Sequence, residues 1–452
     1  MKNKKFSSRS VGTARGIKKS AVSVGIIGLG TVGTGVAQIL LEKRKELERR
    51  LGFPLVVRRI ADIDIKRKRG IRLTNDIFTT DKDEVLNDPG IDIVVELIGG
   101  IHPAKEFILK AIKKGKHVVT ANKLLLATEG SDIFRAARKN KVDVGFEAAV
   151  AGGIPIIKII REALIGNKVQ AIYGIINGTS NFILTKMSEE GIDFLTALNE
   201  AKRLGYAEAD PTLDVKGIDS AHKLAILASL AFGLPCSLKK IFTEGITRIT
   251  PLDISFADEF GYRIKLLAIA KQINGDIELR VHPTMVPKEY LISSVNGVFN
   301  AIYVEGDAIG SALYYGKGAG KMPTGSAVVS DIVDIARNIK TGAVNRIQGM
   351  GMPEKSGLRI KRMEDVYSSY YFRFSALDKP GVLSRISGIL GAHNISIKSV
   401  IQKGRKKEKA VPLVMMTHKA KEKDVVLSLK EINRLSVVSG RTMYLRVEGR
   451  EE

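Results

Sequence analysis

One short stretch of the chain, GYAEADPTLDVKGIDSAHK at residues 205–223, contains four carboxylates and ends at Lys223. Asp219 and Lys223 are four residues apart, so they share one face of the apolar helix predicted to follow the acidic loop. The other acids of the loop are Glu208, Asp210 and Asp214. Their spacing does not fit the calcium-binding loop of an EF-hand. Two interpretations stay open. The stretch is an ordinary helix start with an ion pair, or its acids bind a cationic amine while the protonated Lys223 donates a proton.

A glycine motif, GLGTVG, directly follows the apolar segment VSVGIIG and opens a predicted helix. The first glycine permits a tight turn, the second lets the backbone approach a pyrophosphate, and the third allows the helix to pack closely on the strand. This context predicts a dinucleotide site at the N-terminus of the helix. Its residues are Gly28, Gly30, Thr31, Val32 and Gly33.

Two further segments, ELIGG at 96–100 and TANK at 120–123, each end a predicted strand. Ligands of open parallel sheets lie beyond the carboxyl ends of the strands. We therefore expect Gly99 to contact the cofactor and Lys123 to point into the cleft. The alternative for Lys123 is a surface lysine at a helix start.

The choice between NAD and NADP depends on the end of the second predicted strand, LVVRRIAD. Asp62 at its end would accept hydrogen bonds from a ribose hydroxyl, which favours NAD. Four basic residues at 66–69 follow and could pair with a 2′-phosphate. The two signals conflict. We favour NADP and leave NAD, or the use of both, open.

The elements that must position these residues fall into three blocks. Strands alternate with helices over 21–150, which predicts a parallel sheet covered on both faces, and strand segments within 320–340 are candidates for returning to it. Residues 151–340 are typical of an α+β domain, in which IPIIKIIREALIG is predicted as one helix. A linker at 341–366 leads to 367–452, whose β-α-β-β-α-β order is ferredoxin-like. The basic residues 1–20 are predicted to be a disordered tail.

Composition limits the classes of function. The 452-residue chain carries a net charge of +24, which favours anionic ligands. It lacks Trp, a zinc finger and an aromatic RNA-binding motif, so we expect no specific nucleic-acid partner. No apolar run is long enough for a membrane span. The single cysteine, Cys236, indicates a reducing, cytoplasmic setting. The six histidines show no metal spacing, and His222 is expected to face solvent.

The run from Ala201 to Lys223 matches the signature of the homoserine dehydrogenase family at every specified position. The resemblance covers about residues 20 to 340, through GLGTVG, VVELIGG, TANKLLLA, FEAAVAGGIPI, NGTSNFIL and GAG. It implies a Rossmann domain followed by a catalytic and dimerisation domain, in a homodimer or homotetramer. It also implies the NAD(P)-dependent interconversion of L-homoserine and L-aspartate 4-semialdehyde, a step towards threonine, methionine and isoleucine.

The resemblance further implies residue roles. Lys223 would give the carbonyl oxygen its proton during reduction, and Lys123 would assist beside the nicotinamide. The substrate would be bound by Glu208, Asp219, Asp214 and Thr179, and the cofactor would also touch Gly320. The family holds a monovalent cation, which we take as sodium. Its ligand positions, mainly backbone carbonyls, match Glu147, Val150, Gly152 and Ile154.

The segment DKPGVLSRISGILGAHNISI at 378–397 resembles the first β-α-β of an ACT domain. Such domains commonly bind amino acids at paired interfaces and regulate the attached enzyme, and threonine is the natural candidate. Its ligand positions would be Asp378, Gly381, Val382 and Asn394. A domain that only assists assembly is the alternative. We expect a chain without residues 367–452 to stay active and to lose inhibition. A non-catalytic sensor on the same fold is the rival function, which the intact lysines and acids disfavour.

Overall fold

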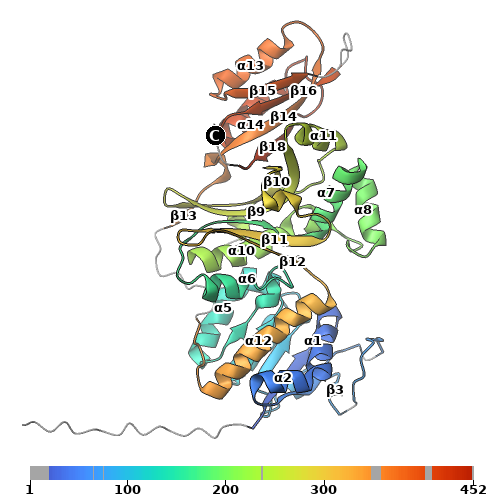
Figure 1. The fold of residues 1–452 in the computed structure, drawn as a ribbon, viewed down its shortest axis with the longest axis vertical. Helices are drawn as coiled ribbons and strands as arrows, with labels where there is room; N and C mark the ends of the chain where they lie inside the picture. Colours follow the sequence, from blue (N-terminus) through green and yellow to red (C-terminus); the bar gives the residue numbers. More distant parts are fainter. Residues whose placement is uncertain are drawn as a thin grey trace, which may run out of the picture.

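The computed structural model describes residues 20–64, 66–74, 76–235, 238–347, 358–402 and 410–449. Three regions follow one another along the long axis in the order of the sequence (Figure 1). The predicted fold class is confirmed: a Rossmann-like parallel sheet, an α+β region and a ferredoxin-like region. Most of the predicted basic tail, as well as Cys236, falls outside the described residues.

The first region contains a six-stranded sheet with the order β3-β2-β1-β4-β5-β6. Every neighbouring pair in it runs parallel. The strands are β1 (Val22–Ile27), β2 (Leu55–Ala61), β3 (Phe78–Thr79), β4 (Ile93–Glu96), β5 (His117–Thr120) and β6 (Val144–Gly145). The strand order reverses between β1 and β4, which is where such sheets bind their ligands.

Helices cover both faces of this sheet. They are α1 (Thr31–Glu42), α2 (Arg44–Leu51), α3 (Asp83–Leu86), α4 (Ala104–Lys113) and α5 (Lys123–Asn140). Helix α12 (Lys321–Thr341) joins them from far along the chain, and its Val328 and Ile332 are fully buried in the same core as α1. A Cβ at Gly35 of α1 would meet Lys321 O at 2.2 Å, so the two helices touch through their backbones. The return of 320–340 is therefore made by a helix and not by strands.

The middle region is built on long antiparallel strands. They are β7 (Val169–Ile175), β9 (Tyr262–Ile273), β10 (Asp276–Pro287), β11 (Phe299–Gly306) and β12 (Gly310–Lys317), with the short β8 (Phe242–Thr243) at β10. Its helices include α7 (Gly178–Glu190), α8 (Phe194–Arg203), α9 (Thr212–Val215), α10 (Ile218–Phe232) and α11 (Pro251–Glu259). The helix predicted at IPIIKIIREALIG is present over 156–163, as a short α6 (Ile156–Lys158) that continues directly into a π-helix (Ile159–Ala163).

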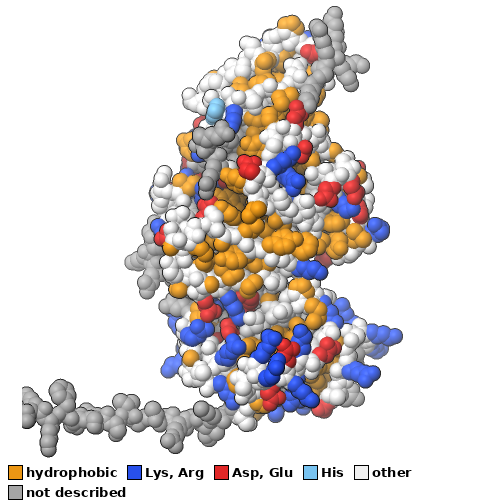
Figure 2. Space-filling model, viewed as in Figure 1, with side chains coloured by type: hydrophobic (Ala, Val, Ile, Leu, Met, Phe, Trp, Pro, Cys, Tyr) orange, Lys and Arg blue, Asp and Glu red, His pale blue; other side chains and the backbone are white. Residues whose placement is uncertain are grey.

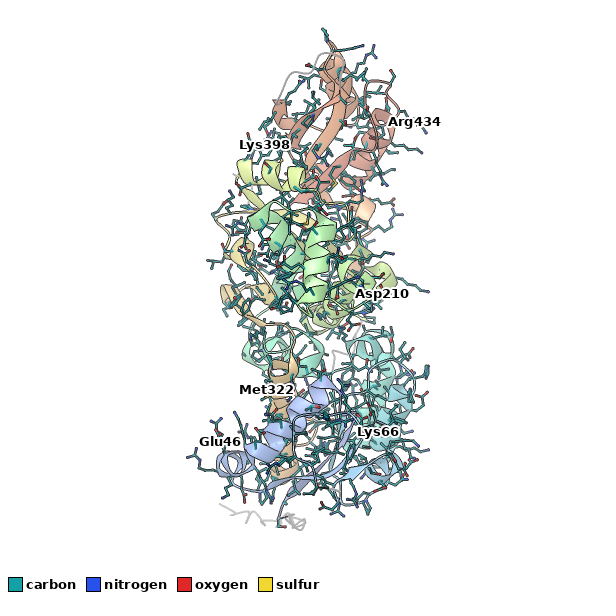
Figure 3. All side chains as sticks on the ribbon, turned by 90° about the vertical axis from the view of Figure 1, so that its right-hand side faces the viewer. Glu46, Lys66, Asp210, Met322, Lys398 and Arg434 are labelled. Carbon is teal, nitrogen blue, oxygen red and sulfur yellow. The ribbon has the colours of Figure 1, made fainter. Side chains whose placement is uncertain are left out.

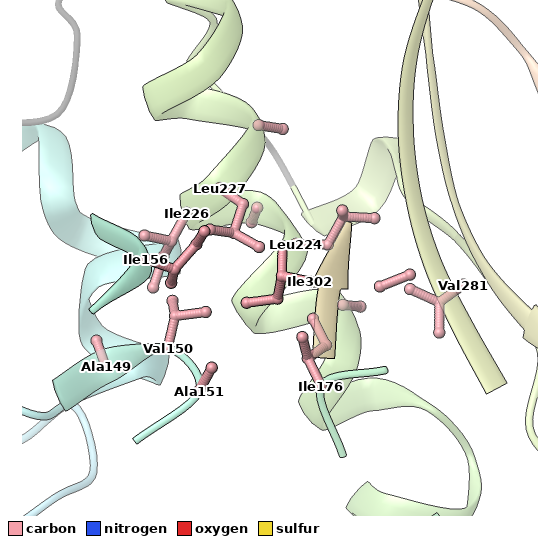
Figure 4. Packing of buried hydrophobic residues seen from close by; sticks show 14 of the residues in the cluster. Ala149, Val150, Ala151, Ile156, Ile176, Leu224, Ile226, Leu227, Val281 and Ile302 are labelled. Carbon is pink, nitrogen blue, oxygen red and sulfur yellow. The ribbon is translucent and has the colours of Figure 1, made fainter. Parts of the chain in front are cut away.

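Helix α10 runs through the centre of the main core (Figure 4). Leu224 and Leu227 are fully buried, and they pack among residues of the β-sheet and of the loop near α6. The labelled neighbours in Figure 4 are Ala149, Val150, Ala151, Ile156, Ile176, Val281 and Ile302. Because apolar side chains surround it on all sides, α10 is held rigidly, and any charged residue on it needs a partner.

The C-terminal region has the order β14 (Tyr367–Leu377), α13 (Val382–Ala392), β15 (Ile397–Gln402), β16 (Ala410–Thr417), α14 (Glu422–Ile432) and β18 (Met443–Val447). Its strands lie in the order β18-β14-β16-β15, as the ferredoxin-like pattern requires. The sheet does not stop there. Strand β18 pairs in parallel with β10 through Thr284–Arg446 and Met285–Val447, so the middle and C-terminal sheets form one twelve-stranded sheet.

The surfaces of the first and middle regions differ in the kinds of side chain that they expose. Basic side chains gather over the first region, and an apolar band crosses the middle region over β9, β11 and β12 (Figures 1 and 2). Among the described residues, no helix has the length and apolarity that a membrane crossing requires.

Candidate active site

Three charged side chains from two regions meet at the centre of the molecule. Asp219 lies in the first turn of α10 and is 4% exposed. One turn later on the same helix, Lys223 Nζ lies 2.7 Å from Asp219 Oδ2. Lys123, the first residue of α5 in the nucleotide-binding region, places its Nζ 2.5 Å from Asp219 Oδ1. One buried carboxylate therefore joins two lysines across the boundary between the regions.

Lys223 is held by more than its ion pair. Its Nζ also donates to the carbonyl oxygen of Ile176 at 2.6 Å, at the end of β7. Both acceptors are fixed, one by the sheet and the other by the core helix α10. The amine of Lys223 is therefore pre-oriented, which is a requirement for a proton donor.

Asn177 completes this network, and the sequence reasoning missed it. Its Nδ2 donates to Asp214 Oδ1 at 2.6 Å and to Asp219 Oδ2 at 2.8 Å. Its Oδ1 accepts from the backbone N–H of Ser180 at 2.8 Å, as the N-cap of α7. The only sequence signal was an asparagine that opens the helix in NGTSNFIL, which by itself indicates a cap.

The electrostatics of the cluster favour proton transfer. Burial lowers the pKa of Lys223, and the charge of Lys123 lowers it further, while Asp219 opposes both. Burial alone would raise the pKa of Asp219, but the charges of Lys223 and Lys123 outweigh it and hold that pKa well below its usual value. The acid is therefore a permanent anion, and the lysine gives up its proton more readily than a lysine in water.

His222 is more buried than the sequence analysis predicted. It was expected to face solvent, but it is only 8% exposed, because nearly every residue of α10 is covered. Burial lowers its pKa, and the nearby lysines do the same against the opposing charge of Asp219. A neutral imidazole therefore lies beside the cluster. Helical periodicity could not show this, since α10 has no exposed face.

The remaining predicted substrate residues lie around the network. Asp214 is part-buried, and burial raises its pKa although Asn177 donates to it. Thr179 donates from Oγ1 to Tyr206 O at 2.6 Å, at the rim of the site. Glu208 is exposed on the loop, and the interactions described for residues 20–235 do not join it to the cluster. Asp210 projects outward (Figure 3), and its Oδ1 accepts from the backbone N–H of Thr212 at the start of α9.

The glycine motif forms the predicted turn between β1 and α1. A Cβ at Gly33 would meet Gly28 O at 2.1 Å, and one at Gly28, whose φ is +97°, would meet Leu97 C at 2.8 Å. A Cβ at Gly30 would meet nothing within 4 Å. The fold itself therefore requires Gly28 and Gly33, whereas Gly30 leaves open space in front of the N-terminus of α1. Thr31 and Val32 form its first turn, where a phosphate would bind.

The carboxylate of Asp62 already forms a hydrogen bond and an ion pair within the protein. Its Oδ2 accepts from Leu29 N at 2.5 Å, and its Oδ1 lies 3.2 Å from the guanidinium of Arg69. Arg69 is also bound to the backbone of Leu29 and Arg67 and is nearly buried. The three preceding basic residues, Lys66, Arg67 and Lys68, are exposed. The four basic residues at 66–69 therefore have different environments. Arg69 stabilises the loop through its hydrogen bonds, and the other three side chains face solvent.

A buried acid that the sequence reasoning passed over shapes the loop after β4. Glu96 is fully buried, and its Oε1 accepts from the backbone of Ile98 at 2.9 Å and Gly99 at 3.2 Å. Its Oε2 accepts from Thr120 at the end of β5. Glu96 thereby holds Gly99 at the carboxyl edge of the sheet. Gly320, with a φ of +124°, lies at the start of α12.

Residues 147–154, which include the ligand positions implied for a cation, form a tight loop. Ala151 and Gly152 have φ values of +55° and +48°, and a Cβ at Gly152 would meet Gly318 O at 2.5 Å. The carboxylate of Glu147 accepts from the backbone of Ile157 and Lys158, at 2.8 and 2.9 Å, so it offers a ligand only its carbonyl. Within the described residues, no group of three or more His, Cys, Asp or Glu could hold a metal. A cation here would depend on the carbonyls of Glu147, Val150, Gly152 and Ile154.

The four residues predicted to bind an effector lie at two ends of one helix. Gly381 and Val382 begin α13, with Asp378 in the preceding turn, whereas Asn394 follows its C-terminus with a φ of +58°. A helix of eleven residues is about 16 Å long. Val382 is also buried in the domain core. One small amino acid therefore cannot touch all four in a single chain.

Known proteins of one family are similar to this chain in sequence and in structure. The family models "Homoserine dehydrogenase, NAD binding domain", "Homoserine dehydrogenase" and "ACT domain" match residues 28–147, 155–333 and 370–437. The chain is 48% identical to a homoserine dehydrogenase of Pseudomonas aeruginosa, over 94% of this chain and 99% of that protein. A crystal structure of a homoserine dehydrogenase from Thiobacillus denitrificans is similar with a TM-score of 0.89 at 46% identity, covering 95% of this chain and 98% of that one. A hyperthermophilic archaeal homoserine dehydrogenase in complex with NADPH is similar with a TM-score of 0.60 at 29% identity, covering 70% and 97%.

Proposed function

Because the chain belongs to the homoserine dehydrogenase family and carries an ACT domain, we propose that it interconverts L-homoserine and L-aspartate 4-semialdehyde with NADP. The reaction is a step towards threonine, methionine and isoleucine, and the proposed setting is the cytoplasm. The observation that supports this most directly is the triad of Lys123, Asp219 and Lys223, which lies between the nucleotide-binding edge and the core helix α10.

The chemistry follows from these contacts. When bound, a reduced nicotinamide supplies a hydride to the aldehyde carbon. Lys223 gives its Nζ proton to the carbonyl oxygen as negative charge develops there, and its lowered pKa favours that transfer. Lys123 adds a second positive charge near the same oxygen. In the reverse direction, neutral Lys223 takes the proton of the homoserine hydroxyl.

The acids bind the other end of the substrate. Asp219 is already paired with two lysines, so it mainly fixes the donors. Asp214 and the exposed Glu208 have oxygens left to accept from the substrate ammonium, and Thr179 lines the same rim. This division assigns proton transfer to the buried side of the site and amine recognition to its open side.

NADP is the cofactor that the loop after β2 favours. The Asp62 carboxylate, which would bind the ribose hydroxyls of NAD, is engaged by Leu29 N and Arg69. The exposed Lys66, Arg67 and Lys68 lie at the same strand end and can approach a 2′-phosphate. The archaeal relative is in complex with NADPH, which agrees with this assignment.

A sodium ion in the loop at 147–154 is part of the proposal. Carbonyl oxygens are suitable ligands for a hard cation, and the two left-handed residues turn this backbone sharply. The loop adjoins both α12 and α6, so an ion there would stabilise the joint between the two regions.

We also propose that the protein forms a homodimer through the sheet of the middle region. One face of an antiparallel sheet that meets water is normally polar, yet here it carries stacked rings of Phe299 and Tyr315, with centroids 5.0 Å apart. A cavity of about 730 Å³ opens beside Tyr173 and Tyr303 on this face. Apolar faces of this kind are typical of subunit interfaces. A monomeric mass in solution at all working concentrations would reject the dimer.

Pairing of subunits also bears on regulation. The two ends of α13 could meet around one amino acid only if the ends came from different copies, as in the paired interfaces of ACT domains. Threonine is the proposed ligand of Asp378, Gly381, Val382 and Asn394. The test is inhibition by threonine in the assay described next.

The experiment that decides the activity is a direct assay. Purified protein is mixed with L-homoserine and NADP+, or NAD+ in parallel, and reduced nicotinamide is followed by its absorbance with and without threonine. A rising signal, faster with NADP+ and lower with threonine, supports the proposal. A flat trace from folded protein that still binds the cofactor would favour a non-catalytic sensor and overturn it.

A further inference from the structure

We propose that Asn177 is a positioning residue, which holds the carboxylates of Asp214 and Asp219 together and aims Asp219 at Lys223. This inference rests on the proposed function, because those carboxylates are given their roles there. Asn177 itself touches neither lysine through a described hydrogen bond, and it would act through its two acidic partners.

The orientation of the Asn177 amide is decided by its neighbours. The side chain is 5% exposed, and it lies between one donor, the N–H of Ser180, and two acceptors, the carboxylates of Asp214 and Asp219. Only Oδ1 can accept from Ser180, and only Nδ2 can donate to the acids. A flipped amide would lose all three bonds, so the group has one orientation.

Two carboxylates brought to one amide nitrogen would repel each other in a buried site. Both N–H groups of Asn177 are directed at them, which offsets that repulsion. The hydrogen bond from Asn177 lowers the pKa of Asp214, against the raising effects of burial and of the charge of Asp219. Loss of Asn177 would therefore shift Asp214 towards its neutral form, which cannot bind an ammonium as well.

Asp219 is affected differently. Its Oδ2 accepts from both Asn177 and Lys223, at 2.8 and 2.7 Å. Without the amide, Asp219 Oδ2 loses one of its two donors and can shift, and the Lys223 amine then keeps only the carbonyl oxygen of Ile176 as a fixed acceptor. A misplacement of reacting groups by about 1 Å can cost about 100-fold in rate, so the expected loss of kcat/KM for homoserine is of that order.

The decisive variants keep the helix cap and remove the double donor. Asn177→Ser and Asn177→Asp both retain a good N-cap residue for α7. If Asn177 were only a cap, Asn177→Ser, which adds no charge beside the two acids, would keep the activity of the parent. We expect both to lose about 100-fold in kcat/KM for homoserine while the affinity for NADP stays unchanged. In Asn177→Ser, the acid limb of the pH profile should move to higher pH, because Asp214 would be protonated more easily.

A second readout does not depend on activity. In folded Asn177→Ser, the pKa of Asp214 is higher than in the parent. The Tm of the variant is therefore closest to that of the parent at low pH, where Asp214 is protonated in both proteins. The deficit in Tm should therefore widen as the pH rises through the pKa of Asp214, which lies above its ordinary value in the parent and higher still in the variant. The control is Asp193→Ala, which removes the cap of α8 far from the cluster. The pKa of Asp193 is lowered by bonds to Thr196, so its deficit should stay level over this range.

The outcomes separate the two proposals. If the parent does not oxidise homoserine, the proposed function fails, and the widening Tm deficit alone tests Asn177. If the parent is active but Asn177→Ser keeps its pH profile and a level Tm deficit, the positioning role is wrong. A loss of activity accompanied by equal loss of NADP affinity would also overturn it, since that result indicates general damage.

Discussion

Lys123 and Asp219 lie 96 residues apart in sequence, yet Lys123 Nζ is 2.5 Å from Asp219 Oδ1. The lysine begins the helix that follows the last long strand of the nucleotide-binding sheet, and the acid begins the buried helix of the middle region. The contact therefore closes the site only when both regions are folded and joined. It also pairs two lysines from different regions with the same carboxylate.

Replacement of Lys223 by alanine should remove the proton donor. We expect Lys223→Ala to lower turnover by about 100- to 10,000-fold, the usual contribution of a positioned acid or base, with little change in NADP affinity. Steady-state kinetics and a cofactor titration check this. Lys216→Ala is the matched control, because Lys216 is exposed on the same stretch. Near-normal turnover in Lys223→Ala would exclude the assigned role.

The Asp219→Asn variant should change the pH dependence of aldehyde reduction. Asp219 raises the pKa of Lys223 against burial, so its removal lowers that pKa further. Reduction needs the protonated lysine and is lost as pH rises through its pKa, so the alkaline limb should move to lower pH. The exposed Asp210 gives a control, Asp210→Asn, that should keep the profile of the parent. An alkaline limb that stays in place would show that another group donates the proton.

The sequence alone predicted much of this site because its main features are local. GLGTVG lies within one strand-turn-helix unit, and Asp219 and Lys223 are one helical turn apart. Asn177 could not be found in that way, because its partners lie 37 and 42 residues further along the chain. The burial of His222 was hidden for a related reason: it depends on elements packed around α10 from all sides.

Strand pairing between distant parts of the chain likewise limited how much of the fold could be predicted from the sequence. The ferredoxin-like order of residues 367–452 follows from local patterns, and it was predicted correctly. The parallel pairing of β18 with β10 joins residues about 160 positions apart, and no local pattern encodes it. The expected linker is likewise more structured than its polar composition indicated, since β13 (Arg359–Ile360) also pairs with β10.

Charge reversal on the loop after β2 should reveal the cofactor preference. We expect Lys66→Glu combined with Lys68→Glu to raise KM for NADP by about 10-fold or more, with a smaller effect on NAD, because only NADP carries the 2′-phosphate. Kinetics with both cofactors measure the ratio. Arg138→Glu combined with Lys139→Glu, at the far end of α5 from Lys123, makes the same change in net charge and is the control. Equal effects on NADP and NAD would remove these lysines from the phosphate site.

Removal of the C-terminal region should destabilise the enzyme, contrary to the expectation from sequence that activity would survive. Arg280 of β10 lies 2.5 Å from Glu448, and Asp253 of α11 lies 2.6 Å from Arg373. A chain without residues 367–452 lacks both of these partners, and it also uncovers the edge of β10 that pairs with β18. We expect a lower Tm and weak activity in the truncated chain. A truncated chain as stable and active as the parent would show that the joined sheet has no such effect.

The response to threonine therefore needs a variant that keeps the joined sheet intact. Asn394 adopts a φ of +58°, which glycine also adopts without strain. Asn394→Gly removes only the amide that would bind the effector. We expect unchanged Tm and turnover with at least about 10-fold weaker inhibition by threonine, since one lost hydrogen bond to a charged group is worth about 1.5–3 kcal/mol. Inhibition curves of parent and variant measure this, and identical curves would place the effector elsewhere.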